Sequence, residues 1–371
     1  MRIFYVTSCL GDSGGSEIYT RDIIKEFIRR GHDVFVFTSS HYKNPSIKTY
    51  NIRTFGHHGL HKFELSLCFR KAVKLAREFR ADIVQTHGTA VVGLIGHFVK
   101  NALGIPHITL IETISSIDKT LHARFVFATE RFLVPRLNYD GIAIWNERIK
   151  DKFLIPWGID KREITIVPVA LDLEGYDPSV DTTEVRKKYG ENLITCMKTF
   201  YYRNAKGIEY LIEAMKIVSK RHPEYRLLIF GGGEYRKHLE DFVKEQGVGE
   251  FVKLPGFLPP EVYKKVCVIS DVAPHSFTYG ISASLSLLEY MAMGISCVVT
   301  DIGSIREFTG DSVLLVKPKD PKSIADGIIK LIENPELRKK LGEKARERAK
   351  NNYSIRNVVD KLEVMFNECK R

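Results

Sequence analysis

The 371-residue sequence lacks several features that would assign its class at once. No apolar run approaches the ~18 residues of a membrane-spanning helix. We expect no signal peptide, because residues 1–10 already have the pattern of a strand. The six cysteines include no Cys-x-x-Cys pair, and most lie in apolar runs, which is typical of buried thiols in a reducing compartment. We therefore expect a cytoplasmic protein without disulfides or a zinc site.

Charge is plentiful but uneven along the chain, whose net charge is +11. Residues 1–170 hold 24 Lys and Arg against 16 Asp and Glu, a net of +8. The other 201 residues hold 32 against 29, a net of +3. A basic N-terminal half indicates an anionic partner, which would be a membrane surface, a phosphorylated acceptor or nucleic acid. The plain alternative is the solvated surface of a lysine-rich protein.

Short β-branched runs alternate with helical periodicities, which is typical of α/β folds with parallel sheets. The patterns predict strands at 2–8, 34–38, 82–86, 107–111, 141–145, 164–168, 193–196, 225–230, 251–254, 297–301 and 314–316. They predict helices at 65–79, 91–103, 208–220, 284–293 and 354–369, and a first helix that ends at Gly31. Residues 40–63 hold no clear element, and the aromatic, basic segment 125–137 is expected to pack as a helix or to touch lipid.

Residues 271–311 carry the most informative pattern. A helix at 284–293 follows the small-residue run 280–284, whose backbone N–H groups can come close to an anion. The helix N-terminus adds a partial positive charge, so the site suits a diphosphate. Glu289 lies about one turn further in, between apolar residues. Its carboxylate either accepts hydrogen bonds from a vicinal diol such as a ribose or faces solvent, as in an ordinary βαβ unit.

This stretch resembles the signature segment of the family-4 glycosyltransferases, the retaining sugar-nucleotide enzymes of GT-B architecture. The matching residues are 287–294, 298–301 and 303–307. The first glycine loop is similar as well, since the family has Gly-Gly-x-Glu and then a helix that ends in Gly-His-x-Val. Here these residues are Gly14, Gly15, Glu17, Gly31, His32 and Val34. The resemblance covers nearly the whole chain, most strongly at 11–38 and 206–311, and most weakly at 41–63 and 113–139.

The resemblance, together with the alternating pattern, implies an α/β fold with two Rossmann-like doubly wound domains that face a cleft. Residues 1–172 would form an acceptor-binding domain, and residues 173–353 a nucleotide-sugar-binding domain. A linker rich in Asp, Gly and Pro at 172–183 marks the boundary. The closing helix within residues 354–371 would pack back on the N-terminal domain.

The resemblance also implies a donor site. Its predicted residues are Gly14, Gly15, Lys206, Gly231, Gly233, Ser282, Ser284, Leu285, Ser286 and Glu289. Family members clamp the donor diphosphate with an Arg and a Lys five residues apart, just before a Gly. Lys198 and Arg203 keep that spacing here, with Asn204 and Ala205 inserted. The pair Lys206-Gly207 keeps the Lys–Gly join instead, but puts Tyr201 where the Arg belongs.

Two positions depart from the family pattern. Ile281 stands where the family has the first of two glutamates, which positions the donor hexose. Glu112 stands where the family has a histidine that reaches the donor sugar. A carboxylate there would bind sugar hydroxyls, stabilise positive charge at the anomeric carbon, or cap a helix without any role in chemistry. His87 and His107 are alternatives, although His107 should be a core residue of its strand.

We therefore expect a retaining hexosyltransferase that moves a sugar from a UDP- or GDP-linked donor to a hydroxyl of a glycan, lipid-linked or anionic acceptor. Glu112, Lys198 and Arg203 are its predicted catalytic residues. No Asp-x-Asp motif occurs, so we expect no metal, and no cofactor beyond the nucleotide sugar as co-substrate. The basic N-terminal domain suggests peripheral contact with the inner face of the membrane.

Two alternatives stay open. The first is a catalytically impaired sugar-nucleotide-binding protein of the same fold, because Ile281 and Glu112 depart from the family pattern. The second is a nucleic-acid-binding module, suggested by the basic balance. It is the least favoured because no DNA or RNA motif supports it, so we expect no nucleic-acid partner.

Overall fold

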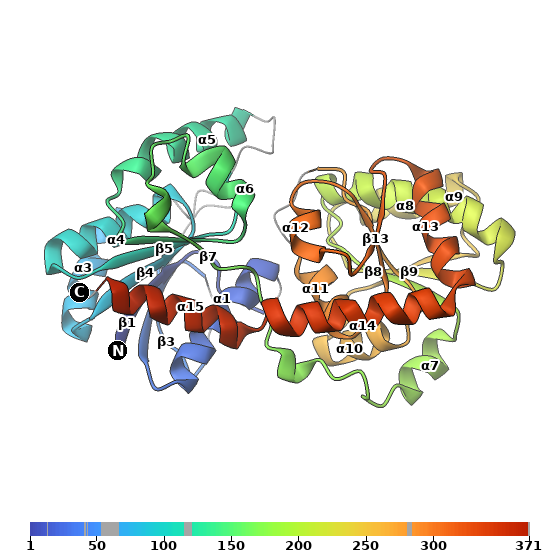
Figure 1. The fold of residues 1–371 in the computed structure, drawn as a ribbon, viewed down its shortest axis with the longest axis horizontal. Coiled ribbons are helices and arrows are strands. Elements are labelled where there is room, and N and C mark those ends of the chain that lie inside the picture. Colours follow the sequence, from blue (N-terminus) through green and yellow to red (C-terminus); the bar gives the residue numbers. More distant parts are fainter. Residues whose placement is uncertain are drawn as a thin grey trace. The chain divides into compact units, whose positions relative to one another are not determined.

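The computed structural model describes residues 1–12, 14–40, 42, 44–52, 67–114, 121–279 and 284–369, and only the backbone at 121–123 and 202–205. The chain divides into two compact units. The first unit comprises Met1–Leu171 and Ile355–Arg371, and the second comprises Asp172–Ser354. Each is built of parallel strands and helices (Figure 1). No described helix is long and apolar enough to cross a membrane.

The first unit contains a seven-stranded parallel sheet in the order β3-β2-β1-β4-β5-β6-β7. Its strands are β1 (Arg2–Thr7), β2 (Asp33–Thr38), β3 (Lys48–Asn51), β4 (Ile83–His87), β5 (His107–Ile111), β6 (Gly141–Ile144) and β7 (Ile164–Ile166). The β-branched and aromatic runs predicted as strands are fully buried in β4, β5 and β6, as expected for a sheet covered on both faces. The chain winds in opposite directions from β1 and from β4, so their carboxyl ends form a topological switch point.

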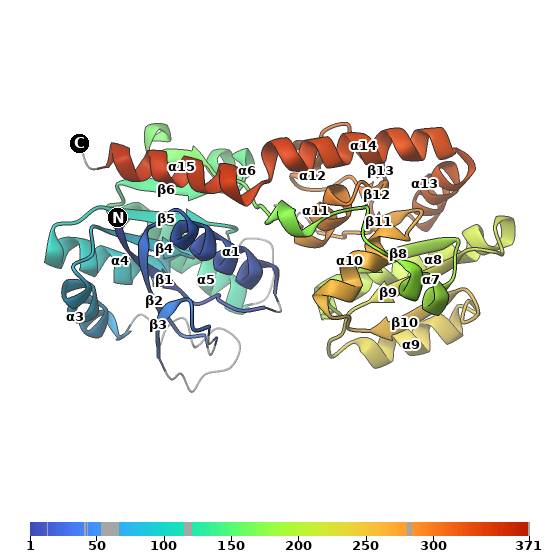
Figure 2. The same ribbon diagram turned by 90° about the horizontal axis from the view of Figure 1, so that it is seen from below.

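Helices cover both faces of this sheet (Figure 2). They are α1 (Gly15–Arg29), α3 (Phe69–Phe79), α4 (Ala90–Leu103), α5 (Leu121–Leu133), α6 (Glu147–Ile149) and α15 (Ile355–Glu368), with the short helical turns η2 (Val134–Arg136), η3 (Lys150–Leu154) and η4 (Lys161–Glu163). Helices α1 and α15 pack together, and α4 lies between α3 and α5. The rings of Phe27 and Phe366 stack with centroids 5.5 Å apart and join α15 to α1.

Strand β3 corrects the expectation that residues 40–63 hold no element. Its Lys48 pairs with Phe35 of β2, and its Asn51 pairs with Thr38. None of its four residues is fully buried, because an edge strand needs little apolar surface. The sequence therefore shows no alternating pattern there. The rest of that predicted segment, at 53–63, lies outside the described residues.

The second unit contains two three-stranded parallel sheets, β10-β9-β8 and β11-β12-β13. Its strands are β8 (Leu193–Met197), β9 (Arg226–Phe230), β10 (Val252–Gly256), β11 (Ala273–His275), β12 (Cys297–Thr300) and β13 (Leu314–Val316). A parallel bridge between Ile194 and Val272 joins the two sheets. The Thr195 N–H donates to the Val272 carbonyl at 3.1 Å. The joined order 3-2-1-4-5-6 repeats that of the first unit, with a second switch point between β8 and β11.

The helices of the second unit surround these sheets (Figure 1). They are α7 (Thr183–Tyr189), α8 (Tyr202–Arg221), α9 (Arg236–Glu245), α10 (Pro260–Val268), α11 (Leu285–Ala292), α12 (Ile305–Thr309), α13 (Pro321–Glu333) and α14 (Pro335–Asn352), with the turn η5 (Leu173–Gly175). Helix α8 packs against α13 over β8 and β9, and its Leu211 and Met215 are fully buried. This core fixes where the loops at the carboxyl ends of the strands emerge.

Candidate functional site

The switch point of the first unit brings together His87, Glu112 and Ser16. His87 is the last residue of β4, Glu112 follows β5 directly, and Ser16 lies in the first turn of α1. The His87 Nε2 lies 2.7 Å from one carboxylate oxygen of Glu112, and the Ser16 hydroxyl donates to the other. The His87 side chain is 2% exposed and that of Glu112 is 14% exposed. Glu112 is therefore held at both oxygens but remains reachable.

The second ring nitrogen of His87 is also engaged. Its Nδ1 lies 2.8 Å from the Thr20 hydroxyl oxygen and 3.1 Å from the Tyr5 hydroxyl oxygen. The Thr20 hydroxyl donates to the Ser16 carbonyl at 2.8 Å, so it can only accept a hydrogen bond from Nδ1. The Tyr5 hydroxyl can donate to Nδ1 when that nitrogen carries no proton. In that tautomer Nε2 carries the proton and donates to Glu112, which fixes the orientation of the carboxylate.

The predicted glycine loop enters the same switch point. Gly14 precedes α1, and its N–H donates to a carboxylate oxygen of Glu17 at 3.2 Å. Gly15 is the first residue of α1, directly before Ser16. The structure thus places Gly14, Gly15 and Glu112 together. His107, by contrast, is fully buried in β5 as expected, where burial lowers its pKa to about 3.

In the second unit Lys198 follows β8 at the second switch point. It is 8% exposed, and its Nζ lies 3.6 Å from the centroid of the Phe277 ring. No carboxylate of the described residues lies within ion-pair distance of Lys198. Burial lowers its pKa to about 8, because the ammonium has lost its water. An anion that entered here would meet a cation that forms no ion pair with any residue the structure describes.

His275 ends β11 beside Lys198. It is fully buried, and neither ring nitrogen has a hydrogen-bond partner among the described residues. Burial and the nearby Lys198 charge hold the pKa of His275 well below its usual range. The ring lies against Phe277 and Tyr290 at centroid distances of 6.1 and 5.5 Å. A neutral imidazole therefore completes the wall around Lys198.

The glycine loop after β9 holds the Lys198 segment in place. Gly231 and Gly233 have φ values of +136° and +146°, which a side chain rarely adopts. A Cβ on Gly231 would overlap the Lys198 carbonyl oxygen, and one on Gly233 would lie 2.7 Å from that of Phe200. The Lys198 N–H donates to the Phe230 carbonyl at 2.9 Å. Both glycines are needed for this close packing, and contact with a donor stays a prediction.

Glu289 lies on α11, in the same unit. The Tyr176 hydroxyl donates to its Oε1 at 2.8 Å. Burial raises the pKa of Glu289 to about 7, although the hydrogen bond from Tyr176, the nearby Tyr263 hydroxyl and the charge of Lys264 act in the opposite direction. The predicted donor residues Ser284, Leu285 and Ser286 open the helix, and the Ser284 hydroxyl accepts the Leu287 N–H at 3.3 Å.

The other predicted residues are less informative. Lys206 lies in α8, where its Nζ bonds the Glu209 carboxylate at 2.8 Å and its side chain is 53% exposed. The Arg203 side chain and Ser282 lie outside the described residues. Among the predicted cations, the structure therefore describes a buried position at the switch point for Lys198.

Sequence reasoning missed several partners of these residues. Tyr5, Ser16, Thr20 and Tyr176 were not predicted, and His87 was only an alternative. A signal existed for His87, since it directly follows the predicted strand 82–86, next to the strand that leads to Glu112. Tyr176 lies in the linker, where the sequence offers no comparable pattern.

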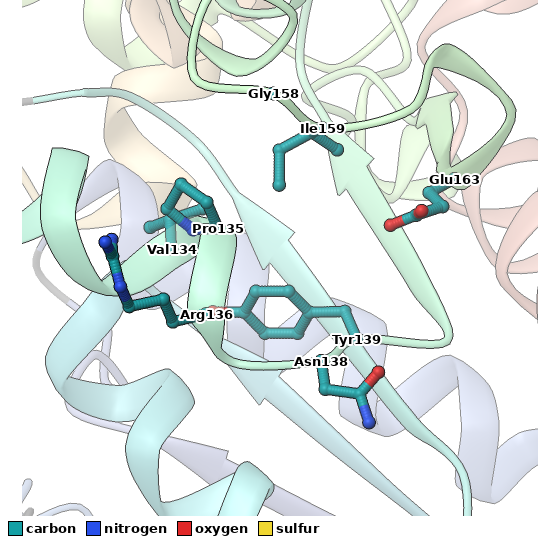
Figure 3. A pocket seen from close by; sticks show the side chains of 8 residues that line it. All are labelled: Val134, Pro135, Arg136, Asn138, Tyr139, Gly158, Ile159 and Glu163. Atoms are coloured by element: carbon teal, nitrogen blue, oxygen red, sulfur yellow. The ribbon is translucent and has the colours of Figure 1, made fainter.

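A cavity of about 240 Å³ lies elsewhere in the first unit (Figure 3). It is lined by Val134, Pro135, Arg136, Asn138, Tyr139, Gly158, Ile159 and Glu163. Several of these residues precede β6 and β7, at the amino ends of the strands. The cavity is therefore at the opposite edge of the sheet from His87 and Glu112.

Each of the two units matches a family model of glycosyltransferases. The family model described as Glycosyltransferase Family 4 matches residues 13–174. The family model described as Glycosyl transferases group 1 matches residues 181–348. The two matches fall on the first and second units respectively.

Relatives that match over nearly the whole length of both chains are also glycosyltransferases or sugar-transferring synthases by name. N-acetyl-alpha-D-glucosaminyl L-malate synthase of Bacillus anthracis is 24% identical over 392 residues, which cover 100% of this chain and 98% of that protein. D-inositol 3-phosphate glycosyltransferase of Corynebacterium efficiens is 25% identical over 393 residues, covering 97% and 92%. The structure of Anabaena HepE in complex with UDP and glucose matches with a TM-score of 0.80 and 18% identity, over 99% of this chain and 100% of that one.

Proposed function

Because the chain belongs to the family-4 glycosyltransferases of GT-B fold, we propose that it moves a hexose from a nucleotide-diphosphate sugar to an acceptor hydroxyl with retention at the anomeric carbon. The second unit would bind the donor, and the first unit would contact the acceptor. The reaction would take place in the cytoplasm. UDP is the first nucleotide to test, since HepE was crystallised with UDP and glucose.

Lys198 carries the proposal. It is a buried cation without a carboxylate partner among the described residues, at the switch point where open α/β sheets bind ligands. The departing diphosphate gains negative charge in the transition state, and a fixed cation in a dry site stabilises that charge. With Arg203 and Lys206 as further predicted cations, the diphosphate would be neutralised without a divalent metal.

Glu112 would contact the substrate from the first unit. Each of its carboxylate oxygens already accepts one hydrogen bond, from His87 or Ser16, and each can accept another. A carboxylate held in this way can bind sugar hydroxyls or stabilise positive charge at the anomeric carbon. His87 would act as a positioning residue, because it reaches the substrate only through Glu112.

The acceptor would be anionic or lipid-linked. The names of the two curated relatives contain L-malate and D-inositol 3-phosphate, which are both anions. The first part of this chain is also the more basic, at +8 for residues 1–170. An excess of positive charge raises the local concentration of an anionic acceptor.

The test is incubation with labelled UDP- and GDP-sugars, with and without EDTA, in the presence of anionic acceptors. We expect a sugar transfer or slow donor hydrolysis that EDTA leaves unchanged, and a product with the anomeric configuration of the donor by NMR. Tight nucleotide binding without any turnover of these donors would favour the catalytically impaired alternative. Loss of turnover in EDTA would overturn metal independence.

A further inference from the structure

Helix α5 of the first unit exposes a face made of arginine and phenylalanine. Phe125 is 72% exposed and Phe132 is 59% exposed, the former being the most exposed large apolar side chain described. Arg124 and Arg131 are exposed beside them. These residues recur at i, i+1, i+7 and i+8, so they lie on one side of the helix, two turns apart. We call this surface, with Arg136, the α5 face.

The α5 face carries positive charge only. Between residues 124 and 136 the exposed ionisable side chains are the three arginines, while Glu130 is 2% exposed. None of the three arginines forms an ion pair with a carboxylate among the residues that the structure describes. The Arg136 guanidinium lies 4.1 Å from the centroid of the Phe132 ring. Cations and aromatic rings are therefore interleaved along the surface.

The buried side of α5 shows why the phenylalanines are not core residues. Phe127, on that side, contacts the rings of Phe153 and Trp157 at centroid distances of 6.1 and 5.8 Å. The helix thus already has its own apolar anchor in the unit. The adjoining turn also leaves Ile155 42% exposed. Lys152 and Asp151 are exposed there as well, so the turn adds apolar surface without adding net charge.

We propose that the α5 face docks on a membrane surface rich in anionic lipids. A helix with arginines beside protruding apolar rings can lie in the plane of the interface, with its rings among the acyl chains. The arginine stems are long enough to place their guanidinium groups at the lipid phosphates. The charge complementarity selects anionic headgroups, and the exposed phenylalanines distinguish a membrane from nucleic acid, which offers no acyl layer to bury them. This inference is independent of the proposed glycosyl transfer.

The experiment measures co-sedimentation of the full chain with vesicles, without any sugar donor. We expect binding to vesicles of phosphatidylglycerol and phosphatidylcholine in equal parts, and little binding to phosphatidylcholine alone. The double variant Arg124→Gln/Arg131→Gln should bind about 25-fold more weakly, at about fivefold for each lost charge near the surface. The double variant Phe125→Ser/Phe132→Ser should bind the vesicles about tenfold more weakly, or weaker still, and this loss should persist at high salt, where charge is screened.

Matched controls lie on the second unit. Lys216→Gln/Lys220→Gln removes the same charge from exposed positions of α8, and Phe257→Ser/Ile217→Ser removes side chains that are 65% and 37% exposed. Both controls should bind vesicles as the wild type does. The proposal is overturned if either control loses as much binding as its α5 counterpart, or if both α5 variants bind as the wild type. If the α5 variants lose binding to a DNA duplex but still bind vesicles as the wild type does, the face is assigned to nucleic acid and the proposal is overturned.

Discussion

Glu289 changes its charge within the physiological pH range, because burial raises its pKa to about 7. In the proposed role its carboxylate accepts hydrogen bonds from the donor ribose, which the ionised form does better. Donor affinity should therefore rise with pH up to about 7 and then level off at this group. Glu289→Gln should weaken nucleotide binding by about 1.5–3 kcal/mol, and most of the loss should be seen above pH 7.

Calorimetric titration of UDP at pH 6, 7 and 8 measures both effects. Tyr176→Phe is the matched variant, since it removes a hydrogen bond that lowers the pKa of Glu289. It should move the rise in affinity to higher pH while leaving the limiting affinity at high pH nearly unchanged. An affinity that Glu289→Gln does not alter at any of these pH values contradicts the ribose assignment.

Donor binding should be coupled to proton uptake by Lys198, and the resulting pH dependence of affinity is opposite to that of Glu289. Its pKa of about 8 means that about half of the molecules lack the proton at pH 8. A diphosphate that pairs with the ammonium raises this pKa, so binding should take up to about half a proton per donor at pH 8. Affinity should then fall as pH rises above 8. Calorimetry of UDP binding in buffers of different ionisation enthalpy counts the protons.

Lys198→Ala should abolish that uptake and slow transfer by about 10²–10³-fold, because one partner of the leaving group is lost. Lys206→Ala tests the competing alignment of the clamp, in which Lys206 takes the place of Lys198; its side chain is exposed and bonded to Glu209. If Lys206→Ala produces the larger loss and Lys198→Ala leaves turnover intact, the alignment of the clamp through Lys206 is the better one.

The pair of Glu112 and His87 should behave as one unit. Glu112→Gln removes the charge, and His87→Leu removes the hydrogen bond of 2.7 Å that orients the carboxylate. We expect kcat to fall about 10²-fold in the first variant and about tenfold in the second, with little change in KM for the donor. The double variant should be no slower than Glu112→Gln alone, since His87 acts through Glu112. Fully additive losses would show that His87 has a separate role.

At the residue scale, the sequence predicted the site residues that directly follow strands better than the residues of helices and linkers that bond to them. Glu112 and Lys198 were predicted from the resemblance to the family, each at a position that follows a recognisable strand, and the structure places both at switch points. Their chemical roles remain predictions. Tyr176 and Thr20 were not found, because no periodicity shows which linker or helix side chain will point toward a given carboxylate. Burial of Lys198 and Glu289, which sets their pKa values, also depends on packing that the sequence does not display.

At the scale of elements, the loop after β9 packs directly against the backbone of the loop after β8. Gly231→Ala would place a methyl group on the Lys198 carbonyl at a φ of +136°, so it should destabilise the second unit by about 2 kcal/mol or more. Gly232→Ala is the matched neighbour, since nothing lies within 4 Å of its Cβ position. It should change stability by less than about 1 kcal/mol.

Denaturation by urea, followed by far-UV circular dichroism, compares the two variants. Donor binding should also weaken in Gly231→Ala alone, because its clash shifts the backbone that carries Lys198. Equal stability of the two variants would show that the loops adjust to one another without cost.

Strands with strong apolar patterns were predicted to within about two residues, and weakly patterned strands were missed, whereas helix α8 begins six residues before its predicted start at 208. The predicted strand 107–111 and the observed β5 coincide, and its five residues are all buried. Strand β11 was missed because Ala273, Pro274 and His275 have no β-branched residue. Pairing with β12 and burial define it, and both depend on residues distant in sequence. Strand β3 was missed because it lies at the edge of its sheet, where a strand needs no apolar face and so leaves no alternating pattern in the sequence.

For the whole molecule, the fold class followed from the alternation of strands and helices, and the matches to both glycosyltransferase family models agree with it. The sequence could not show that β8 and β11 meet through Ile194 and Val272, because that bridge joins segments almost eighty residues apart. It is this closure that completes the switch point beside Lys198 and His275. The most informative site of the second unit therefore arises from topology rather than from a local motif.

The closing helix belongs to the first unit although it follows the second unit in the chain. Phe366 is fully buried against Phe27, and Arg30 of α1 bonds Asp360 and Glu363 of α15 at 2.6 and 2.7 Å. Phe366→Ala should therefore destabilise the first unit by about 3–5 kcal/mol. Val364→Ala, at a position 56% exposed on the same helix, should have little effect.

Tryptophan fluorescence isolates this change, because both tryptophans of the chain, Trp145 and Trp157, lie in the first unit. In urea, Phe366→Ala should lower the midpoint of the fluorescence transition by about 1–2 M, given the slope usual for a domain of this size. Gly231→Ala should leave that transition in place while lowering the midpoint seen by circular dichroism. UDP should raise the circular dichroism midpoint without moving the fluorescence midpoint, since the proposed donor site lies in the second unit. A fluorescence transition that Phe366→Ala leaves unchanged would mean that α15 contributes nothing to the stability of the first unit.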